Sequence, residues 1–282
     1  MAIHIGCGSW TDKEYVGVLY PKGVPPRELL AVYSQWFDRV EANSFYRAIP
    51  KREYVERWVA QTPAKFTFDV KLSREFSDDP AAAARGEAMG RFLHAAEPII
   101  AANKLGVFLL PMPPSFSPAK HRLQELDATI EKLAPHALAV ELRHRDWLAG
   151  PQRAETLDYF HAKKLVWVST DTVAADAARL MPLLDVVTNP RHAYFRLHGR
   201  NPAYATAGST DEGHHHDYTA TELTEIAGRI KSVTKQAKEV HVTLNNHAEN
   251  FAPNAAIKLC KLLGVPTLSA IPEKPGRQEE LF

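Results

Sequence analysis

Short runs rich in β-branched and aromatic residues alternate along the chain with longer segments in which apolar residues recur every three or four positions. The short runs predict eight buried strands, at Ile3–Gly8, Arg39–Asn43, Lys65–Lys71, Leu105–Leu110, Ala137–Arg143, Leu165–Thr170, Ala193–His198 and Glu239–Asn245. The longer segments predict helices at Pro26–Trp36, Lys51–Gln61, Arg85–Ala102, Ala119–Leu133, Gln152–Ala162, Thr219–Lys235 and Pro253–Leu263. A weaker helical pattern covers Ala174–Val187.

Eight alternations of strand and helix within about 265 residues indicate an α/β fold, a single (β/α)8 TIM-like barrel over residues 1–265. The alternative is a doubly wound parallel sheet, which usually has fewer strands. Four residues that break regular structure follow the last predicted helix: Pro266, Pro272, Pro275 and Gly276. We therefore expect residues 266–282 to form an extended C-terminal tail.

A long polar loop, Asn201–Tyr218, follows the seventh predicted strand and contains three adjacent histidines, His214, His215 and His216. Such histidines can bind a metal ion, but in a polar loop they are more often only solvated. No metal site is predicted from them.

Because side chains alternate along a strand, one side of each predicted strand should be apolar and face the helices, and the other should line the barrel. In the fifth predicted strand Leu138, Val140 and Leu142 fit the helix-facing side, so Glu141 and Arg143 should point inward. The same alternation directs polar groups of five other strands inward: Glu41, Asn43, Thr67, Asp69, Lys71, Ser169, Asp171, Tyr194, Arg196, His198, His241, Thr243 and Asn245. In the sixth strand this assignment turns Val166 and Val168 toward the helices.

These inward groups lie at or near the C-terminal ends of their strands, the end at which barrel enzymes build their active sites. A salt-bridged plug is the simpler alternative, but a plug needs fewer types of polar group than are found here. We expect a ligand pocket with four catalytic candidates, Glu41, Lys71, Glu141 and His198. The ligand-binding candidates are Ser9, Trp10, Asn43, Tyr46, Arg143, His144, Asp171, Arg196, Arg200, Asn245, Asn246 and His247. The aromatic side chains Trp10, Tyr46 and Trp147 either stack on a ligand ring or close the barrel mouth by packing.

The composition limits the kinds of partner. The 282 residues hold 34 Lys and Arg against 33 Asp and Glu, so the net charge of +1 gives no global basic field, and any anion site must be local. The two cysteines, Cys7 and Cys260, cannot form a disulfide framework and are expected in the core. The sequence shows neither a signal-peptide core nor an apolar run long enough for a membrane helix, so we expect a soluble cytoplasmic protein.

Seven short motifs follow one another along the chain: Gly6-Cys7-Gly8-Ser9-Trp10, Val40-Glu41-Ala42-Asn43-Ser44-Phe45-Tyr46, Phe68-Asp69-Val70-Lys71, Pro113-Pro114-Ser115-Phe116, Glu141-Leu142-Arg143-His144, Phe195-Arg196-Leu197-His198-Gly199-Arg200 and Asn245-Asn246-His247. Together they resemble the YecE-like family, also called domain of unknown function 72. The resemblance extends from residue 1 to about residue 264 and implies a TIM-like barrel without an assigned reaction. Such sequences usually have Gln before Leu-Pro-Pro, whereas this chain has Pro111-Met112-Pro113-Pro114, so an amide expected from the fourth strand is missing.

The last five residues, Gln278-Glu279-Glu280-Leu281-Phe282, are similar to the bacterial sliding-clamp-binding peptide, which has the consensus Gln-x-x-Leu-Phe. An extended tail can place a Leu-Phe pair in an apolar groove while the glutamine amide fixes the register. The alternatives are an unstructured end and a tail that docks on its own barrel. We expect Gln278, Leu281 and Phe282 to bind the clamp, which would hold a nearly neutral protein close to DNA.

Three hypotheses for the function stay open. The first is an enzyme or processing factor of DNA metabolism that acts on a phosphate-bearing substrate, nucleic acid included. Its most concrete form is a phosphodiester hydrolase in which Glu141 or His198 is the general acid or base, while Lys71, Arg143 and Arg196 stabilise negative charge.

The second hypothesis is a sugar-isomerase or aldolase-like enzyme. It would hold a divalent metal with Glu41, Glu141, Asp171 and His198, or form a Schiff base at Lys71. The third is a non-catalytic ligand-binding module recruited by the clamp. No organic cofactor is implied, and a divalent metal stays an open alternative.

Overall fold

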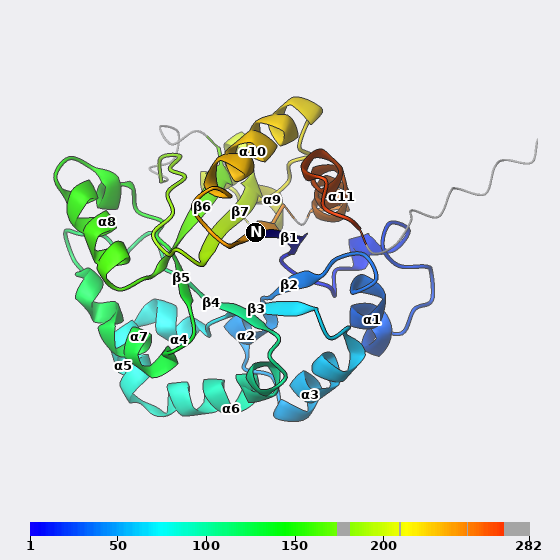
Figure 1. Cartoon of the computed structure of the whole chain (residues 1–282), viewed down its shortest axis with the longest axis horizontal. Coiled ribbons are helices and arrows are strands. Elements are labelled where there is room, and N and C mark those ends of the chain that lie inside the picture. The colour runs from blue at the N-terminus through cyan, green and yellow to red at the C-terminus, as the bar shows by residue number, and fades with distance from the viewer. Residues whose placement is uncertain (174–180, 209, 247, 268–282) are drawn as a thin grey trace, which may run out of the picture.

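The computed structural model describes residues 1–173, 181–208, 210–246 and 248–267. In this part of the chain eight parallel strands form one sheet in the order β1-β8-β7-β6-β5-β4-β3-β2. They are β1 (Ala2–Cys7), β2 (Arg39–Ala42), β3 (Thr67–Lys71), β4 (Leu105–Pro111), β5 (Leu138–Glu141), β6 (Val166–Thr172), β7 (His192–Gly199) and β8 (Glu239–Leu244). The strands β1 and β2, at the two ends of this order, lie side by side (Figure 1). The predicted (β/α)8 barrel is therefore confirmed.

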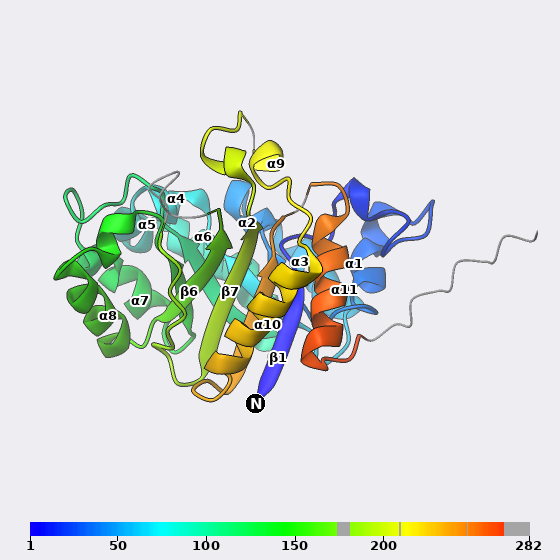
Figure 2. The ribbon, with the colours of Figure 1, turned by 90° about the horizontal axis from the view of Figure 1, so that it is seen from above.

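Helices surround the strands on the outside of the barrel (Figure 1). The α-helices of the described residues are α1 (Leu29–Tyr33), α2 (Ser44–Arg47), α3 (Arg52–Gln61), α4 (Arg74–Asp78), α5 (Pro80–Arg85), α6 (Glu87–Ala101), α7 (Asp127–Leu133), α8 (Gln152–Ala162), α9 (Thr210–Gly213), α10 (Ala220–Val233) and α11 (Phe251–Leu263). Short 3-10 helices cover Lys13–Tyr15, Pro26–Glu28, Leu123–Leu126, Arg145–Leu148 and Pro202–Ala205. Figure 2 shows α9, which follows β7, beyond the C-terminal ends of the strands. None of the described helices is long and apolar enough to span a membrane.

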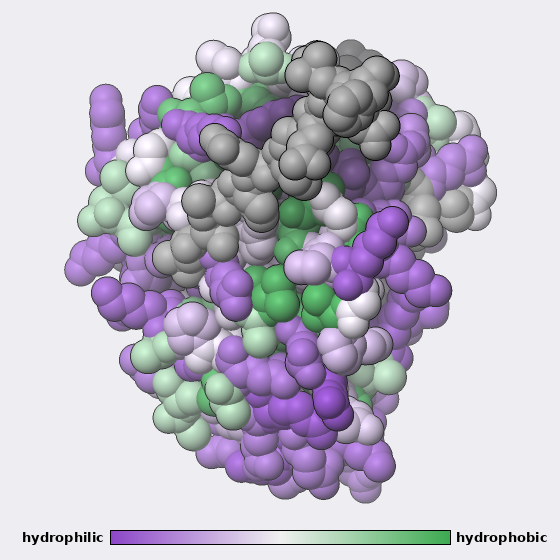
Figure 3. All heavy atoms as spheres, turned by 90° about the vertical axis from the view of Figure 1, so that its right-hand side faces the viewer, coloured by the Kyte–Doolittle hydropathy of each residue, from purple (hydrophilic) through white to green (hydrophobic). Residues whose placement is uncertain are grey.

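The helices turn an apolar stripe to the sheet and a polar face outward. α11 buries Ala252, Ala256, Leu259 and Cys260, which recur at helical spacing. The opposite side of such a helix faces water, and Figure 3, which shows the side of the molecule that carries α1 and α11, is largely hydrophilic with small hydrophobic areas. Cys7 is buried as well, so both cysteines lie in the core as predicted.

A tyrosine bridges the strands at which the barrel closes. Within the described residues no backbone ladder joins β1 to β2. Instead the Tyr33 hydroxyl accepts a hydrogen bond from the Cys7 N–H (2.7 Å) and donates one to the Arg39 carbonyl (3.0 Å). Gly6 permits this approach, because a Cβ there would lie 2.3 Å from the Arg39 carbonyl oxygen. The side chain thus replaces the missing ladder hydrogen bonds.

We expect Tyr33→Phe to lower the free energy of unfolding by about 2 kcal/mol, because a buried N–H and a buried carbonyl both lose their partner. Urea denaturation of the variant beside the wild type measures this. Tyr54→Phe is the matched control, since Tyr54 is exposed and should leave stability unchanged. Equal stability of the two variants would contradict the closing role of Tyr33.

A small apolar cluster lies inside the barrel, beside the polar side chains of the interior. It contains Val107, Leu109, Ala139, Val166, Val168 and Tyr194. The prediction for β6 was wrong, because Val166 and Val168 face inward and not toward the helices. Trp167 occupies the helix-facing side instead, where its ring packs 5.2 Å from that of Phe160. An indole is too large for the narrow interior, so it sets the orientation of the whole strand.

Two segments between the predicted strands also differ from expectation. The weak helix predicted at Ala174–Val187 is absent from residues 181–187, which have no regular structure, and residues 174–180 lie outside the described part. The loop predicted at Asn201–Tyr218 contains the 3-10 helix Pro202–Ala205 and α9. The tail prediction for residues 266–282 falls almost entirely on residues 268–282, which the structure does not describe.

Candidate functional site

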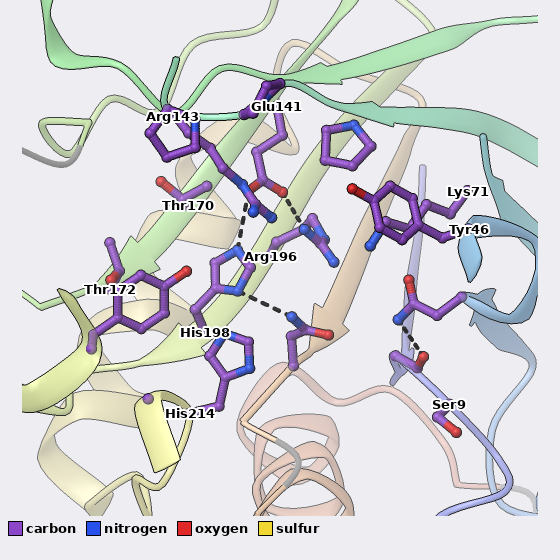
Figure 4. A pocket seen from close by; sticks show the side chains of 18 of the residues that line it. Ser9, Tyr46, Lys71, Glu141, Arg143, Thr170, Thr172, Arg196, His198 and His214 are labelled. Carbon is purple, nitrogen blue, oxygen red and sulfur yellow. Dashed lines mark hydrogen bonds and ion pairs between the residues drawn. The ribbon is translucent and has the colours of Figure 1, made fainter. Parts of the chain in front are cut away.

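A cavity of about 1320 Å³ opens at the C-terminal end of the barrel. The strand ends and the loops after them supply its lining, because the alternation predicted for β2, β3, β5, β7 and β8 turns their polar side chains inward. Many of the predicted site residues line it together: Ser9, Trp10, Asn43, Tyr46, Lys71, Glu141, Arg143, His144, Arg196, His198 and Asn245. Figure 4 shows Lys71 and Tyr46 on one side of the cavity and Glu141, Arg143 and His198 on the other.

The floor of the cavity is an ion-pair network centred on Arg196. Its guanidinium donates to Glu41 through Nε (3.0 Å) and Nη2 (2.7 Å), and to Glu141 through Nη1. All three side chains are almost completely buried. Burial favours the protonated carboxyl, but Arg196 outweighs it for Glu41, and Arg143 and Arg196 outweigh it for Glu141, so both pKa values lie below the ordinary range. Both are ionised at neutral pH, and neither has a proton to donate.

The histidine at the end of β7 is held as a neutral ring. The Asn245 side-chain amide lies 3.1 Å from His198 Nδ1, and Glu141 Oε1 lies 3.4 Å from His198 Nε2. This arrangement assigns the ring proton to Nε2, since Nδ1 accepts from the amide. Burial lowers the pKa of His198 below its ordinary value. The contact of Nε2 with Glu141 is longer than a hydrogen bond, so Nε2 of the neutral ring makes no hydrogen bond with a described residue.

Two cationic side chains face the open part of the cavity. Arg143 pairs with Glu141 through Nε (2.5 Å), yet its side chain is 32% exposed. Lys71 has its Nζ 4.1 Å above the centre of the Tyr46 ring and makes no hydrogen bond or ion pair with any described residue. Burial, with Arg196 and Arg143 nearby, lowers the pKa of Lys71 to about 7. Lys71 is therefore a group of the cavity that changes charge near neutral pH.

The charged lining is predominantly positive. Among the described residues that line the cavity, the cations are Arg47, Lys71, Arg143 and Arg196, and the carboxylates are Asp12 and Glu141. Histidines at positions 144, 198 and 214 and the amides of Asn43 and Asn245 add polar groups. An enclosed surface of this kind suits an anion that can accept several hydrogen bonds.

Some predicted site residues lie elsewhere. Glu41 belongs to the ion-pair network of the floor but does not line the cavity, and it also accepts a hydrogen bond from the Tyr194 hydroxyl (2.9 Å). Asn246 is buried and donates to the His216 carbonyl. His247 falls outside the residues that the structure describes. Trp147 donates to the Phe116 carbonyl and stacks on the Phe116 ring, so it packs beside the site and does not line the cavity.

Asp171 and Arg200 were predicted to bind the ligand, but they form an ion-pair cluster on the helix-facing side of the sheet. Arg200 donates to Asp171 (2.7 Å) and to Glu225 of α10, and Arg229 of α10 donates to Asp171 (2.6 Å). The inverted orientation of β6 explains this placement, since Asp171 shares a face with Trp167 and Ser169. Neither Asp171 nor Arg200 lines the cavity.

The structure adds residues that the sequence analysis missed. Arg39 is fully buried in the barrel, where it pairs with Asp69 and donates to the Tyr194 hydroxyl (2.9 Å). Its position two residues before Glu41 was a signal for this placement. Tyr204 and His214 of the loop after β7 also line the cavity, and His214 stacks on His198 with ring centres 5.3 Å apart.

The predicted divalent-metal set is not assembled at the barrel mouth. Arg196 stands between Glu41 and Glu141, and Asp171 faces outward. Within the described ranges, a group of imidazole and carboxylate side chains close enough to share a metal is His192, Glu239 and His241, at the opposite end of the barrel. There His192 Nδ1 lies 3.1 Å from His241 Nε2, and Glu239 also pairs with Arg191.

Comparisons with known proteins agree with this fold. The family described as "Protein of unknown function DUF72" matches residues 4–279. The chain is 25% identical to the UPF0759 protein YunF of Bacillus subtilis over 289 residues, and 26% identical to the UPF0759 protein YecE of Escherichia coli K12 over 296 residues. Each match covers 99% of this chain and all of the relative.

Two crystal structures of similar proteins have the same architecture. A DUF72 family protein of Enterococcus faecalis superposes with a TM-score of 0.84 at 24% identity, covering 95% of this chain and 98% of that protein. A DUF72 family protein of Thermotoga maritima superposes with a TM-score of 0.78 at 25% identity, covering 94% of this chain and 100% of that protein. The similarity to these structures supports the fold.

Proposed function

The chain belongs to the DUF72 family of proteins of unknown function, and we propose that its barrel mouth binds and acts on a phosphate-bearing substrate. The observation that carries this proposal is the excess of cations over carboxylates among the described groups that line the cavity. Arg143 is the strongest candidate for the phosphate contact. Only its Nε is held by Glu141, so the outer guanidinium nitrogens face the cavity.

The chemistry of the site favours Lys71 over Glu141 as the reactive group. Glu141 is ionised and held by two arginines, so it cannot supply a proton to a leaving group. Lys71 lies in the open cavity and exchanges a proton near neutral pH. Glu41, Glu141 and Arg196 then form a rigid ion-pair network that keeps Arg143 and His198 in position.

We expect Arg143→Ala to weaken phosphate binding about 10- to 100-fold, which corresponds to the loss of one or two charge-assisted hydrogen bonds of about 1.5–3 kcal/mol. Isothermal titration with ribose 5-phosphate and with a short oligonucleotide measures the effect. Arg145→Ala is the matched control, because Arg145 is exposed and does not line the cavity. If both variants bind as the wild type does, Arg143 is not the phosphate contact.

Recruitment to DNA by the bacterial sliding clamp is the second part of the proposal, and it places the protein in the cytoplasm. Its support is the sequence of the last five residues, in which Gln278, Leu281 and Phe282 match the clamp-binding consensus. Clamp binding would raise the local concentration of DNA for a protein whose net charge is only +1. The phosphate site and the clamp motif are separate elements and can be tested separately.

Deletion of residues 278–282 should abolish clamp binding and leave barrel stability unchanged, since these residues follow the last barrel helix in the sequence. Two buried apolar side chains at about 1.5–3 kcal/mol each, with the glutamine hydrogen bonds, support affinity in the micromolar range. Calorimetry with a purified bacterial clamp tests this, with Leu281→Ala/Phe282→Ala beside the deletion. No binding of the intact protein at high micromolar concentration would remove the clamp from the proposal.

A further inference from the structure

We propose that Lys71 is an amine nucleophile that forms a Schiff base with an aldehyde or ketone whose phosphate group is held by Arg143. This inference rests on the proposed function and names the class of its substrate, a phosphorylated carbonyl compound. It is carried by the position of Lys71 in the cavity and by the lack of any acceptor for its amino group among the described residues.

The buried Lys104 shows how this fold provides hydrogen-bond acceptors for an amino group that has only a structural role. Lys104 Nζ donates to the Val59 carbonyl (2.8 Å), the Thr62 carbonyl (2.8 Å) and the Thr62 hydroxyl (2.9 Å). All three donor positions of that ammonium group are occupied. Lys71 has no such set within the described chain; its side chain is half-buried and lines the cavity, whereas Lys104 is buried.

The surrounding charges keep Lys71 available. The nearby carboxylates Glu41 and Glu141 are occupied by arginines and do not form an ion pair with the amine. Arg196 and Arg143 repel a further positive charge, and burial removes water from the ammonium form, so the pKa of Lys71 falls to about 7. About half of the side chains therefore carry a free electron pair at neutral pH, as a nucleophilic lysine requires.

Formation of the Schiff base at Lys71 needs neither an oxidant nor a metal. The Lys71 nitrogen attacks the carbonyl carbon, a C–N bond forms, and the C=O π electrons pass to oxygen, which takes the proton released by nitrogen. The carbinolamine then loses water, and a C=N bond replaces the C–O bond. When protonated, the imine is a cation, which the face of the Tyr46 ring stabilises at the distance seen for Lys71 Nζ.

Arg143 orients the substrate in the cavity. Lys71 and Arg143 project into the same cavity from opposite sides, from the ends of β3 and β5 (Figure 4). A ligand with an anionic group at one end and a carbonyl at the other can therefore contact both. A ligand without the anionic group loses the Arg143 contact and should react more slowly.

Cyanoborohydride trapping of the intact protein tests the inference. The protein is incubated at pH 7 with glyceraldehyde 3-phosphate and sodium cyanoborohydride, which at this pH reduces an imine to a stable secondary amine much faster than it reduces the free aldehyde, and the modified lysine is located by peptide mass spectrometry. We expect Lys71 to carry the adduct at least tenfold above any other lysine, with Lys104 as the internal control for burial. In Lys71→Arg the adduct at this position should disappear. Labelling spread evenly over surface lysines in the wild type would overturn the inference, whether or not the variant folds.

Two further arms separate this inference from the proposed function. Unphosphorylated glyceraldehyde should label Lys71 more slowly, and Arg143→Ala should remove the advantage of the phosphorylated aldehyde. If both aldehydes label Lys71 equally in the wild type, the amine chemistry stands and the phosphate contact is wrong. If ribose 5-phosphate binds in the cavity but no aldehyde labels Lys71, the phosphate site stands and the Schiff base is wrong.

Discussion

Replacing Arg196 by methionine is expected to lower the free energy of unfolding by about 3–5 kcal/mol, because it leaves the buried Glu41 without its cation and Glu141 with Arg143 alone. Glu41 and Glu141 have almost no exposed surface and cannot recover water in its place. Urea denaturation at pH 7 measures the loss. The same variant should bind ribose 5-phosphate poorly, since Arg143 and His198 are positioned by Glu141.

Two further variants show that the loss comes from buried charge. Adding Glu41→Gln to Arg196→Met should recover part of the stability, because it removes the buried carboxylate that has lost its cation. Arg91→Met is the control for a surface pair: Arg91 pairs with Glu75, both side chains are about half exposed, and the change should cost less than about 1 kcal/mol. If Arg196→Met is as stable as Arg91→Met, the floor of the cavity is not the ion-pair network described here.

Lys71 is expected to react with acetic anhydride with a half-maximal rate near pH 7, whereas surface lysines should reach theirs near pH 10. At pH 7 an ordinary lysine with a pKa of about 10.4 is neutral in roughly 0.04% of molecules, so the neutral fraction of Lys71 is about a thousandfold larger. Trace acetylation across a pH series, with each lysine located by mass spectrometry, gives the profile. A midpoint for Lys71 above pH 9 would show that the amine is an ordinary ammonium group.

The lowered pKa of Lys71 also determines how its contribution to the free energy of unfolding changes with pH. Between pH 7 and about 10.4 the unfolded chain binds more protons at this position than the folded chain, so the contribution of Lys71 to stability rises with pH in that window. Below pH 7 both states are protonated and the contribution is at its lowest. The difference in unfolding free energy between the wild type and Lys71→Met should therefore change with pH between 7 and 10, and a constant difference would contradict the assignment.

The alternation of side chains along the strands predicted most of the residues that line the cavity. This rule works wherever one side of a strand is clearly apolar and the other clearly polar. In β5 the apolar residues Leu138 and Val140 alternate with Ala139 and Glu141, and the structure confirms their sides. In β6 both faces begin with apolar residues, so Val166 and Trp167 compete for the interior. The size of the indole decides, and size is not part of a hydrophobic pattern.

Partners from distant segments explain the errors at the site. Asp171 is a carboxylate near the end of a strand, as a site residue often is. Arg229 of α10 and Arg200 of the loop after β7, however, pair with it outside the barrel. Tyr204 and His214 belong to a polar loop whose path no local pattern predicts. Arg39 is different, since its spacing from Glu41 placed it inside the barrel and its pairing with Asp69 satisfies the charge.

A crystal structure of the protein with ribose 5-phosphate bound tests the central claim most directly. We predict the phosphate group within hydrogen-bond distance of the Arg143 guanidinium, with the sugar end of the ligand directed toward Lys71 and Tyr46 across the cavity. A phosphate bound only outside the barrel mouth, at a ligand concentration that saturates binding in solution, would contradict the assignment of this cavity as the functional site.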